Sequence, residues 1–410
     1  MSDGTPSERA VGRRIAFYRQ RRGLSQREFA RLIDRSETWL SQVERGVRKI
    51  DRMTVLERLA GVLEVPLSEL APEAPVVAAA HEELPAATEL GLALSSSHAL
   101  AAVLGTSHEP ADVDELSARV AEAWTYTHAS EFSQVGAMLV GLLPDLETAA
   151  RTTEGEAQQA VFAALARAYH ACAAVLARMA EPGAAWVAAD RAISAAERSG
   201  DALLMAEGAF RLTLVFQAAR RLDRAQQTAA TAAAALEDRA EAGEPEALSI
   251  WGALHLQLAV VAARRNDAEA AYEELAIARR AAERLGVDRN DYNTEFGSTN
   301  VALHEVAVAV ELGDAGRALR GAANVDPSSL SPERQGRFLI DVARAHAQRR
   351  NVPGVVETLS RAVEVAPELA PAHPLVQRLV TDMLRSDLAD EPGLRELADR
   401  LGLSSAMPSM

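Results

Sequence analysis

Two segments of the chain repeat each other, which narrows the possible folds sharply. Residues 184–200 read AAWVAADRAISAAERSG, residues 270–286 read AAYEELAIARRAAERLG, and the two align without a gap. Both carry small residues at helical spacing and end in glycine, which commonly terminates a helix. Because a repeated amphipathic helix buries its apolar face only against its neighbours, the repeat predicts a stack of helices.

The repeat extends over most of the chain. A further helix lies in register upstream of each segment, from Tyr169 to Leu176 in one copy and from His255 to Ala262 in the other. Weaker copies run through residues 212–232, 306–318 and 342–367, and a looser pair of helices is expected over residues 113–150. Only 4% of the residues are aromatic and no convincing strand pattern is present, so we predict an all-α protein.

This pattern resembles a degenerate tetratricopeptide array, with a period of about 40 residues in place of the usual 34 or so. The resemblance implies an α-solenoid over residues 88–402, in which first helices line a concave channel and second helices form an outer layer. A tail follows at residues 403–410. Residues 71–87 contain three prolines among small residues, and we expect them to form a linker that lets the N-terminal part move.

Charge separates the N-terminal part from the rest. The whole chain carries a net charge of −15, yet residues 9–49 hold 12 Arg or Lys against 4 Asp or Glu. A basic N-terminal segment on an acidic protein indicates that this segment alone meets phosphate groups.

The basic segment also contains the signals of several short, capped helices. Residues 24–46 read LSQREFARLIDRSETWLSQVERG, in which Ser25 with Glu28 forms a capping box and Ser36 caps the next helix. With the helices before and after it, this predicts a five-helix domain over residues 1–70, the fifth helix opening at Pro66. The segment resembles the phage-repressor and Cro-like helix-turn-helix family, also called the XRE family.

This resemblance implies that the third helix enters the major groove of duplex DNA. Residues placed to face the bases are Ser36, Glu37, Thr38, Ser41 and Gln42, and residues placed to contact phosphates are Gln26, Arg35, Arg45, Arg48 and Lys49. Gln42 is suited to adenine and Glu37 to the amino group of cytosine. The alternative for each of these side chains is an ordinary solvated helix surface. The resemblance further implies a structural ion pair between Arg19 and Glu44, and packing of Trp39 between helices.

The repeat geometry places polar side chains inside the expected channel. Candidate ligand-binding residues are Arg167, His170, Phe210, Gln217, Asn300, Arg337 and Arg344. The carboxamide of Asn300 is suited to a peptide backbone, and the two arginines at 337 and 344 are suited to a carboxylate. Hydrogen bonds and ion pairs between the helices of an unliganded solenoid are the alternative. Residues 288–300 form a polar interruption that either reaches into the channel or connects two helices at the surface.

Several classes of function lack support in the sequence. Cys172 is the only cysteine, so an intramolecular disulfide and a cysteine-rich zinc site are excluded. No phosphate-binding glycine loop, metal-binding histidine motif or nucleophile elbow is present, so we expect neither an enzyme nor a metal or other cofactor. The N-terminus lacks the order of a signal peptide and no apolar run approaches a bilayer span, which indicates a cytoplasmic protein.

A helix-turn-helix domain joined to a tetratricopeptide body resembles the quorum-sensing regulators of the Rgg, PlcR and PrgX type. The resemblance implies a homodimer that reads a two-fold operator and senses a signalling peptide, and a small-molecule effector is equally compatible with the residues. The alternative is a regulator or adaptor whose repeat domain binds a protein partner without any small ligand.

Overall fold

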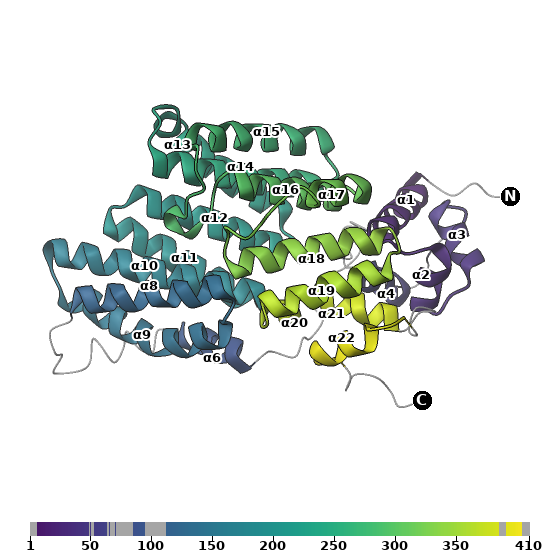
Figure 1. Ribbon diagram of the computed structural model, residues 1–410, viewed down its shortest axis with the longest axis horizontal. Helices are drawn as coiled ribbons and strands as arrows, with labels where there is room; N and C mark the ends of the chain where they lie inside the picture. The colour runs from purple at the N-terminus through teal and green to yellow at the C-terminus, as the bar shows by residue number, and fades with distance from the viewer. Residues whose placement is uncertain are drawn as a thin grey trace.

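The computed structural model describes residues 6–48, 50, 53–63, 65, 70, 85–94, 112–384 and 391–403. Within these ranges the chain is helical, and the only strand-like pairing is an isolated bridge between Arg289 and Phe296. The prediction of an all-α protein is therefore confirmed. Figure 1 shows the small N-terminal group of helices, which we call the head, at one end of the larger helical stack, which we call the body.

The head comprises α1 (Pro6–Arg21), α2 (Gln26–Leu32), α3 (Glu37–Glu44) and α4 (Met53–Leu63). Ile15, Phe29, Leu40 and Leu59 are each fully buried and form the centre of its core. The capping box of Ser25 and Glu28 is present, with both of its hydrogen bonds made. The fifth helix expected from Pro66 lies outside the described residues.

The body is built from six helical hairpins followed by short helices. In each hairpin a first helix is followed by a second helix that packs on it and on the first helix of the next hairpin. The hairpins are α8 (Val113–Ala129) with α9 (Phe132–Thr152), α10 (Gly155–Arg178) with α11 (Pro182–Ser199), α12 (Ala202–Ala218) with α13 (Leu222–Glu241), α14 (Pro245–Arg264) with α15 (Ala268–Leu285), α16 (Ser298–Glu311) with α17 (Ala315–Ala322), and α18 (Pro332–Gln348) with α19 (Val352–Val365). After them come α20 (Leu369–Ala372), α21 (Pro374–Leu384) and α22 (Leu394–Arg400).

The turn inside each hairpin repeats the same backbone geometry. One residue with positive φ follows the first helix in all six hairpins, and the next residue donates its N–H to the carbonyl five positions earlier, as in a Schellman motif. The positive-φ residues are Ser130, Ala180, Arg220, Asn266, Gly313 and Arg350. Five of these six are not glycine, which explains why glycine spacing in the sequence does not reveal the register of the hairpins.

The first helices close into a ring. Each of them contacts the next along the chain, from α8 through α18, and α18 in turn contacts α8. The expected channel is therefore the interior of this ring, and side chains from opposite first helices meet there.

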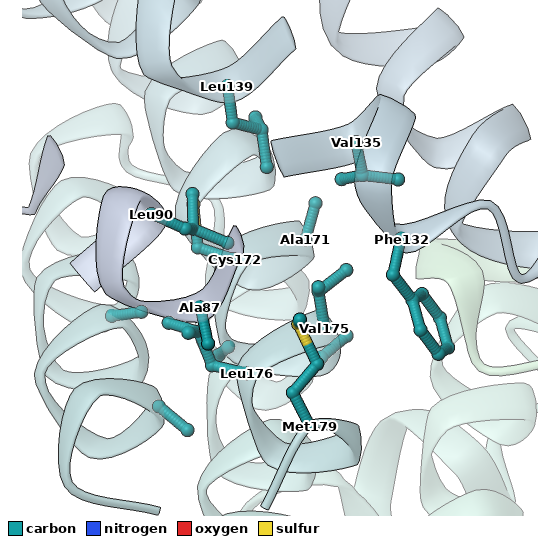
Figure 2. Close-up of a cluster of buried hydrophobic side chains, with 14 of the residues drawn as sticks. Ala87, Leu90, Phe132, Val135, Leu139, Ala171, Cys172, Val175, Leu176 and Met179 are labelled. Carbon is teal, nitrogen blue, oxygen red and sulfur yellow. The ribbon is translucent and has the colours of Figure 1, made fainter. Parts of the chain in front are cut away.

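The body begins earlier than the sequence predicted. Helix α6 (Pro85–Ala93) includes the last three residues of the expected linker, and Ala87 is 2% exposed. Figure 2 shows Ala87 and Leu90 of α6 beside Cys172 and Leu176 of α10, with Leu139 of α9 nearby. The apolar contacts of α6 outweigh the local preference of a proline-containing segment for irregular structure. The rest of the expected linker, residues 71–84, lies outside the described residues.

Contrary to the expectation that no apolar run approaches a bilayer span, two body helices, α10 and α14, are long and apolar enough to cross a membrane. In both, 78% of the apolar window is buried inside the fold. These helices supply the apolar sides that pack against neighbours in the stack, which accounts for their composition.

Candidate nucleic-acid interface and the interior of the ring

The start of α3 is the most exposed polar surface among the residues expected to bind DNA. The hydroxyl of Ser36 accepts the N–H of Trp39 and fixes the first turn of α3. Ser36, Glu37 and Thr38 are exposed, whereas Ser41 and Gln42 one turn later are partly exposed. Figure 1 places α3 at the outer end of the head, on the side turned away from α18 and α19. All five of these side chains therefore lie on one accessible end of the helix.

The arginines around α3 make only light contacts with the protein. The guanidinium of Arg35 lies 5.6 Å from the ring centre of Trp39, and Nε of Arg45 donates to the carbonyl of Ser41 at 3.1 Å. Arg48 approaches the amide oxygen of Gln42 at 3.5 Å. Lys49 lies outside the described residues. Because these cations are exposed and weakly held, they are free to turn toward an approaching phosphate.

An open groove of about 510 Å³ runs along the turn between α2 and α3. Its walls are Arg31, Asp34, Arg35, Ser36 and Trp39. Arg31 lies on the last turn of α2 and is exposed, and it was not among the residues expected to bind DNA. The position of Arg31 in the helix-turn-helix motif was the sequence signal that could have indicated a role at this surface.

The ion pair expected between the first and third helices is present. Nε of Arg19 donates to Glu44 at 2.5 Å, its Nη2 donates to the other carboxylate oxygen at 3.0 Å, and both residues are 8% exposed. Gln26, expected to bind a phosphate, donates its amide N–H to the same carboxylate at 2.7 Å. In this structure Gln26 thus supports the joint between α2 and α3.

The polar segment between α15 and α16 runs into the ring. It contains the short 3₁₀ helix η1 (Asp291–Asn293), and Tyr292, Asn293 and Glu295 all have positive φ, a conformation that costs free energy in non-glycine residues. Arg211 of α12 donates to the carbonyl of Asn293 at 2.7 Å, and His128 of α8 lies 3.2 Å from the side chain of Asn293. Of the two interpretations of this segment, the structure shows the one in which it enters the interior.

Polar groups from other parts of the body bind both the backbone and a side chain of this segment. The amide of Asn300 donates to the carbonyl of Glu295 at 2.5 Å, and Arg334 donates to the carbonyl of Thr294 at 3.4 Å. The carboxylate of Glu295 accepts the N–H of Ser331 at 2.8 Å and lies 3.5 Å from His128. Burial alone would raise the pKa of Glu295, but His128 and Arg334 together lower it to about 2.

Three more of the expected ligand residues are engaged within the protein. His170 is fully buried 3.0 Å from Glu207, whose pKa is lowered by His170 and Arg211 despite its burial. Gln217 donates to Gln257 at 3.0 Å. The Phe210 side chain is 1% exposed within the hydrophobic core, so it presents no open surface to a ligand. These side chains are therefore engaged in contacts within the protein. Such contacts were the alternative to ligand binding.

Arg167 and Arg337 differ from the residues above. Neither guanidinium makes a hydrogen bond or an ion pair to another side chain within the part of the chain that the structure describes. Burial and the nearby Arg334 and Arg178 lower the pKa of Arg337 to about 10, although Glu333 opposes the shift. An unpaired guanidinium beside other cations is an attractive position for an anion.

Positive charge accumulates around His373, between α20 and α21. Burial, followed by four nearby guanidiniums, lowers the pKa of His373 to about 3; these guanidiniums, which we call the arginine cluster, are those of Arg337, Arg344, Arg264 and Arg178. Three carboxylates lie among them. Glu333 pairs with Arg178, Asp341 pairs with Arg344 at 3.0 Å, and Glu311 pairs with both Arg264 and Arg344.

Glu311 also connects the cluster to the head. Arg21, on the last turn of α1, pairs with Glu311, and the amide of Gln348 donates to the carbonyl of Arg21 at 2.7 Å. Burial, followed by Arg344 and Arg264, lowers the pKa of Arg21 to about 9. With Arg21 the site holds five guanidiniums and three carboxylates, so positive charge is in excess. The Arg264 side chain keeps 33% of its surface exposed, and this exposure leaves the cluster open to solvent.

Among the described residues no three His, Cys, Asp or Glu side chains are placed to hold a metal ion. Comparison with known proteins finds a similarity over the head. Residues 10–72 match a family model described as a helix-turn-helix domain. No curated protein sequence matches the chain. Among solved structures, one titled "Crystal Structure of Rap Protein Complexed with Competence and Sporulation Factor" is similar at a TM-score of 0.42 and 13% identity, covering 72% of this chain and 89% of that chain.

Proposed function

We propose that the protein is a sequence-specific transcription regulator that reads duplex DNA with the start of α3. The supporting observation is the exposed, capped first turn of α3, with Ser36, Glu37 and Thr38 accessible in a domain matched by a helix-turn-helix family model. In such domains the start of this helix meets base edges while surrounding cations and amides hold the phosphates. The finer assignment to the phage-repressor type rests on the motif from Leu24 to Gly46.

Two matched substitutions test the roles of bases and phosphates. Gln42→Ala removes a side chain that bonds a base edge, and we expect it to weaken binding to the preferred site by about 1–3 kcal/mol and to relax one base position. Arg48→Ala removes a phosphate contact, so binding to all sequences should weaken alike. Affinities for a footprinted site and for random duplex, measured at one salt concentration, distinguish these outcomes. Equal losses on both duplexes for Gln42→Ala would rule out base readout by that residue.

We also propose that the chain acts as a homodimer on a two-fold operator. One such head reads only a few base pairs, and paired heads reach half-sites about one helical turn apart. Genome-wide footprinting would reveal the symmetry of the operator, and light scattering of the free protein would give its mass. An asymmetric single half-site together with a monomeric mass would contradict this proposal.

A role on chromosomal DNA also places the protein in the cytoplasm.

The body, we propose, senses a small anionic effector at the arginine cluster. The segment 288–297 already fills part of the ring interior, which favours a compact ligand over a long extended peptide. The excess positive charge and the unpaired guanidinium of Arg337 support a carboxylate or phosphate as the ligand group. Such an anion competes with Glu311 for Arg264 and Arg344, and Glu311 is the residue that also holds Arg21 of the head. This shared carboxylate offers a route from effector to head.

Thermal unfolding of the full chain with citrate and with inorganic phosphate tests the effector site. A ligand that binds only the folded state raises the melting temperature, so we expect at least one of these anions to do so in a saturable way. Arg337→Gln should remove the effect, whereas Arg280→Gln, at an exposed position on α15, should leave it intact. No saturable shift with either anion, or an equal shift in the Arg337→Gln variant, would count against an anion site at this cluster.

A further inference from the structure

The head is docked on the body through a polar seam. Arg22 pairs with Asp382 of α21 at 2.6 Å, Glu28 pairs with Arg350, and Arg378 donates to the carbonyl of Gly61 at 3.0 Å. Gly23 lies so close to α18 that a Cβ atom there would come within 2.3 Å of the carbonyl oxygen of Ala347. Head and body are therefore in direct contact along the C-terminal hairpin and α21.

A cavity of about 240 Å³ lies inside this seam, and its walls come from both units. Its apolar lining includes Leu24 and Leu32 from the head and Ala347, Val352, Val355, Leu379 and Met383 from the body. Water in such a space would lie against hydrocarbon on both sides. A largely apolar molecule that replaced this water would gain the free energy of apolar burial.

Seven charged residues line the cavity, and six of them are paired with one another, while the seventh, Arg31 of α2, is exposed. Arg22 with Asp382 and Arg350 with Glu28 bridge the two units, and Arg58 with Asp34 forms a 2.5 Å pair within the head. Because the charges within these three pairs balance, a charged ligand would meet no free counter-charge among them. The same groups still offer hydrogen bonds to one polar group of a ligand.

The volume limits the size of the occupant. A dry cavity of about 150 Å³ accommodates benzene, and drug-sized ligands occupy roughly 300 Å³ or more. The cavity in the seam lies between these limits, which corresponds to one ring with a short polar substituent. Interfaces between domains are also where small-molecule sites most often occur.

We propose that this cavity is a binding site for a small uncharged molecule with a single ring and one hydrogen-bonding group. The site is separate from the arginine cluster, and binding there does not depend on DNA. Because the ligand contacts both units, occupancy stabilises the docked head. Any effect on DNA binding would follow from this docking and rests on the proposed function.

Three compounds that share a phenylethyl-type skeleton serve as probes of the full chain in the absence of DNA. They are 2-phenylethanol, which is uncharged, 2-phenylethylammonium, which is a cation, and phenylacetate, which is an anion. Calorimetric titration should show saturable binding of 2-phenylethanol, with a dissociation constant of about 1 mM or tighter, and at least tenfold weaker binding of both ions. Absence of saturable binding by the alcohol, or tighter binding of either ion, would overturn the proposal.

Substitutions that fill the cavity from either wall test whether the ligand binds there. Leu32→Trp fills it from the head and Leu379→Trp fills it from the body, and each should weaken binding of 2-phenylethanol at least tenfold. Leu92→Trp, at a 61% exposed position on α6, is the matched control and should bind as the parent does. Circular dichroism checks the folding of each variant, and either filled variant alone suffices if the other does not fold. Undiminished binding in a folded cavity variant would refute the assignment.

Discussion

His304 of α16 shows how the polar interior of the ring affects stability. Its ring is 7% exposed, Nδ1 lies 2.9 Å from the carbonyl of Asn300, and burial together with Arg334 and Arg337 lowers its pKa to about 3. The folded protein therefore keeps this histidine neutral at pH values where the unfolded chain protonates it. Between about pH 6.5 and pH 3 the unfolded state binds the extra proton, so the free energy of unfolding falls as the pH falls.

We predict that His304→Gln reduces this acid sensitivity. One proton difference corresponds to about 1.4 kcal/mol per pH unit, so the variant should lose about 2 kcal/mol less than the parent between pH 6.5 and pH 4.5. Urea denaturation at the two pH values measures the difference. His373, whose pKa is also about 3, contributes in the same direction in both proteins and leaves the comparison unaffected. An identical loss in parent and variant would mean that His304 is not the responsible group.

At the residue scale the sequence predicted the head better than the ring. The Arg19–Glu44 pair follows from positions in a well-defined motif, and its side chains meet as expected. Inside the ring, partners come from elements far apart in the chain, such as Gln217 with Gln257 and Arg334 with the carbonyl of Thr294 on the incoming segment. Residue type and helical phase indicate that such a side chain points inward, but they do not identify its partner.

Among the elements, the segment 288–297 packs closely against α14 at one glycine. The ring of Phe296 is fully buried and occupies the space beside Gly252 of α14, where a Cβ atom would lie 2.0 Å from the ring. A glycine at this position of α14 is therefore needed for the segment to enter the interior. Arg211 and His128 then bind the segment from the other side.

We predict that Gly252→Ala destabilises the protein by about 1–3 kcal/mol, because the added methyl group displaces the Phe296 ring. Gly141→Ala in α9 is the matched control, since no atom lies within 4 Å of the new Cβ and alanine favours the helix by roughly 0.5–1 kcal/mol. Thermal or urea unfolding should thus move in opposite directions for the two variants. Unchanged stability of the Gly252→Ala variant would mean that the Phe296 ring does not pack directly against Gly252.

Local sequence patterns predicted the helical hairpins, whereas long-range contacts determine the path of the segment 288–297 and the position of α6. Alanine spacing and terminal glycines located the helices of the body, because these signals act within one or two turns. The path of the segment 288–297 depends instead on Arg211, 82 positions away from Asn293, and on His128, 165 positions away. Helix α6 was assigned in part to a linker for a similar reason, since its burial depends on α9 and α10.

At the scale of the whole molecule, the head and the body are joined by few but well-placed contacts. The sequence suggested independent units separated by a mobile linker, and the structure shows the head docked through Arg21, Arg22 and Glu28. The partners of these residues, Glu311, Asp382 and Arg350, all lie far away in the chain. Docking leaves the start of α3 exposed at the outer end of the molecule (Figure 1), so a docked head is still able to approach DNA.

The most direct test of the central claim is the binding of the purified full chain to duplex fragments of its own genome over a range of salt concentrations. Cations around α3 that neutralise phosphates release counterions, so the logarithm of the affinity should fall linearly as the logarithm of the salt concentration rises, with selected fragments bound above the rest. Citrate, phosphate and 2-phenylethanol are each included in parallel series. Failure to bind any duplex fragment in a salt-dependent manner, with or without these compounds, would contradict a role as a DNA-binding regulator.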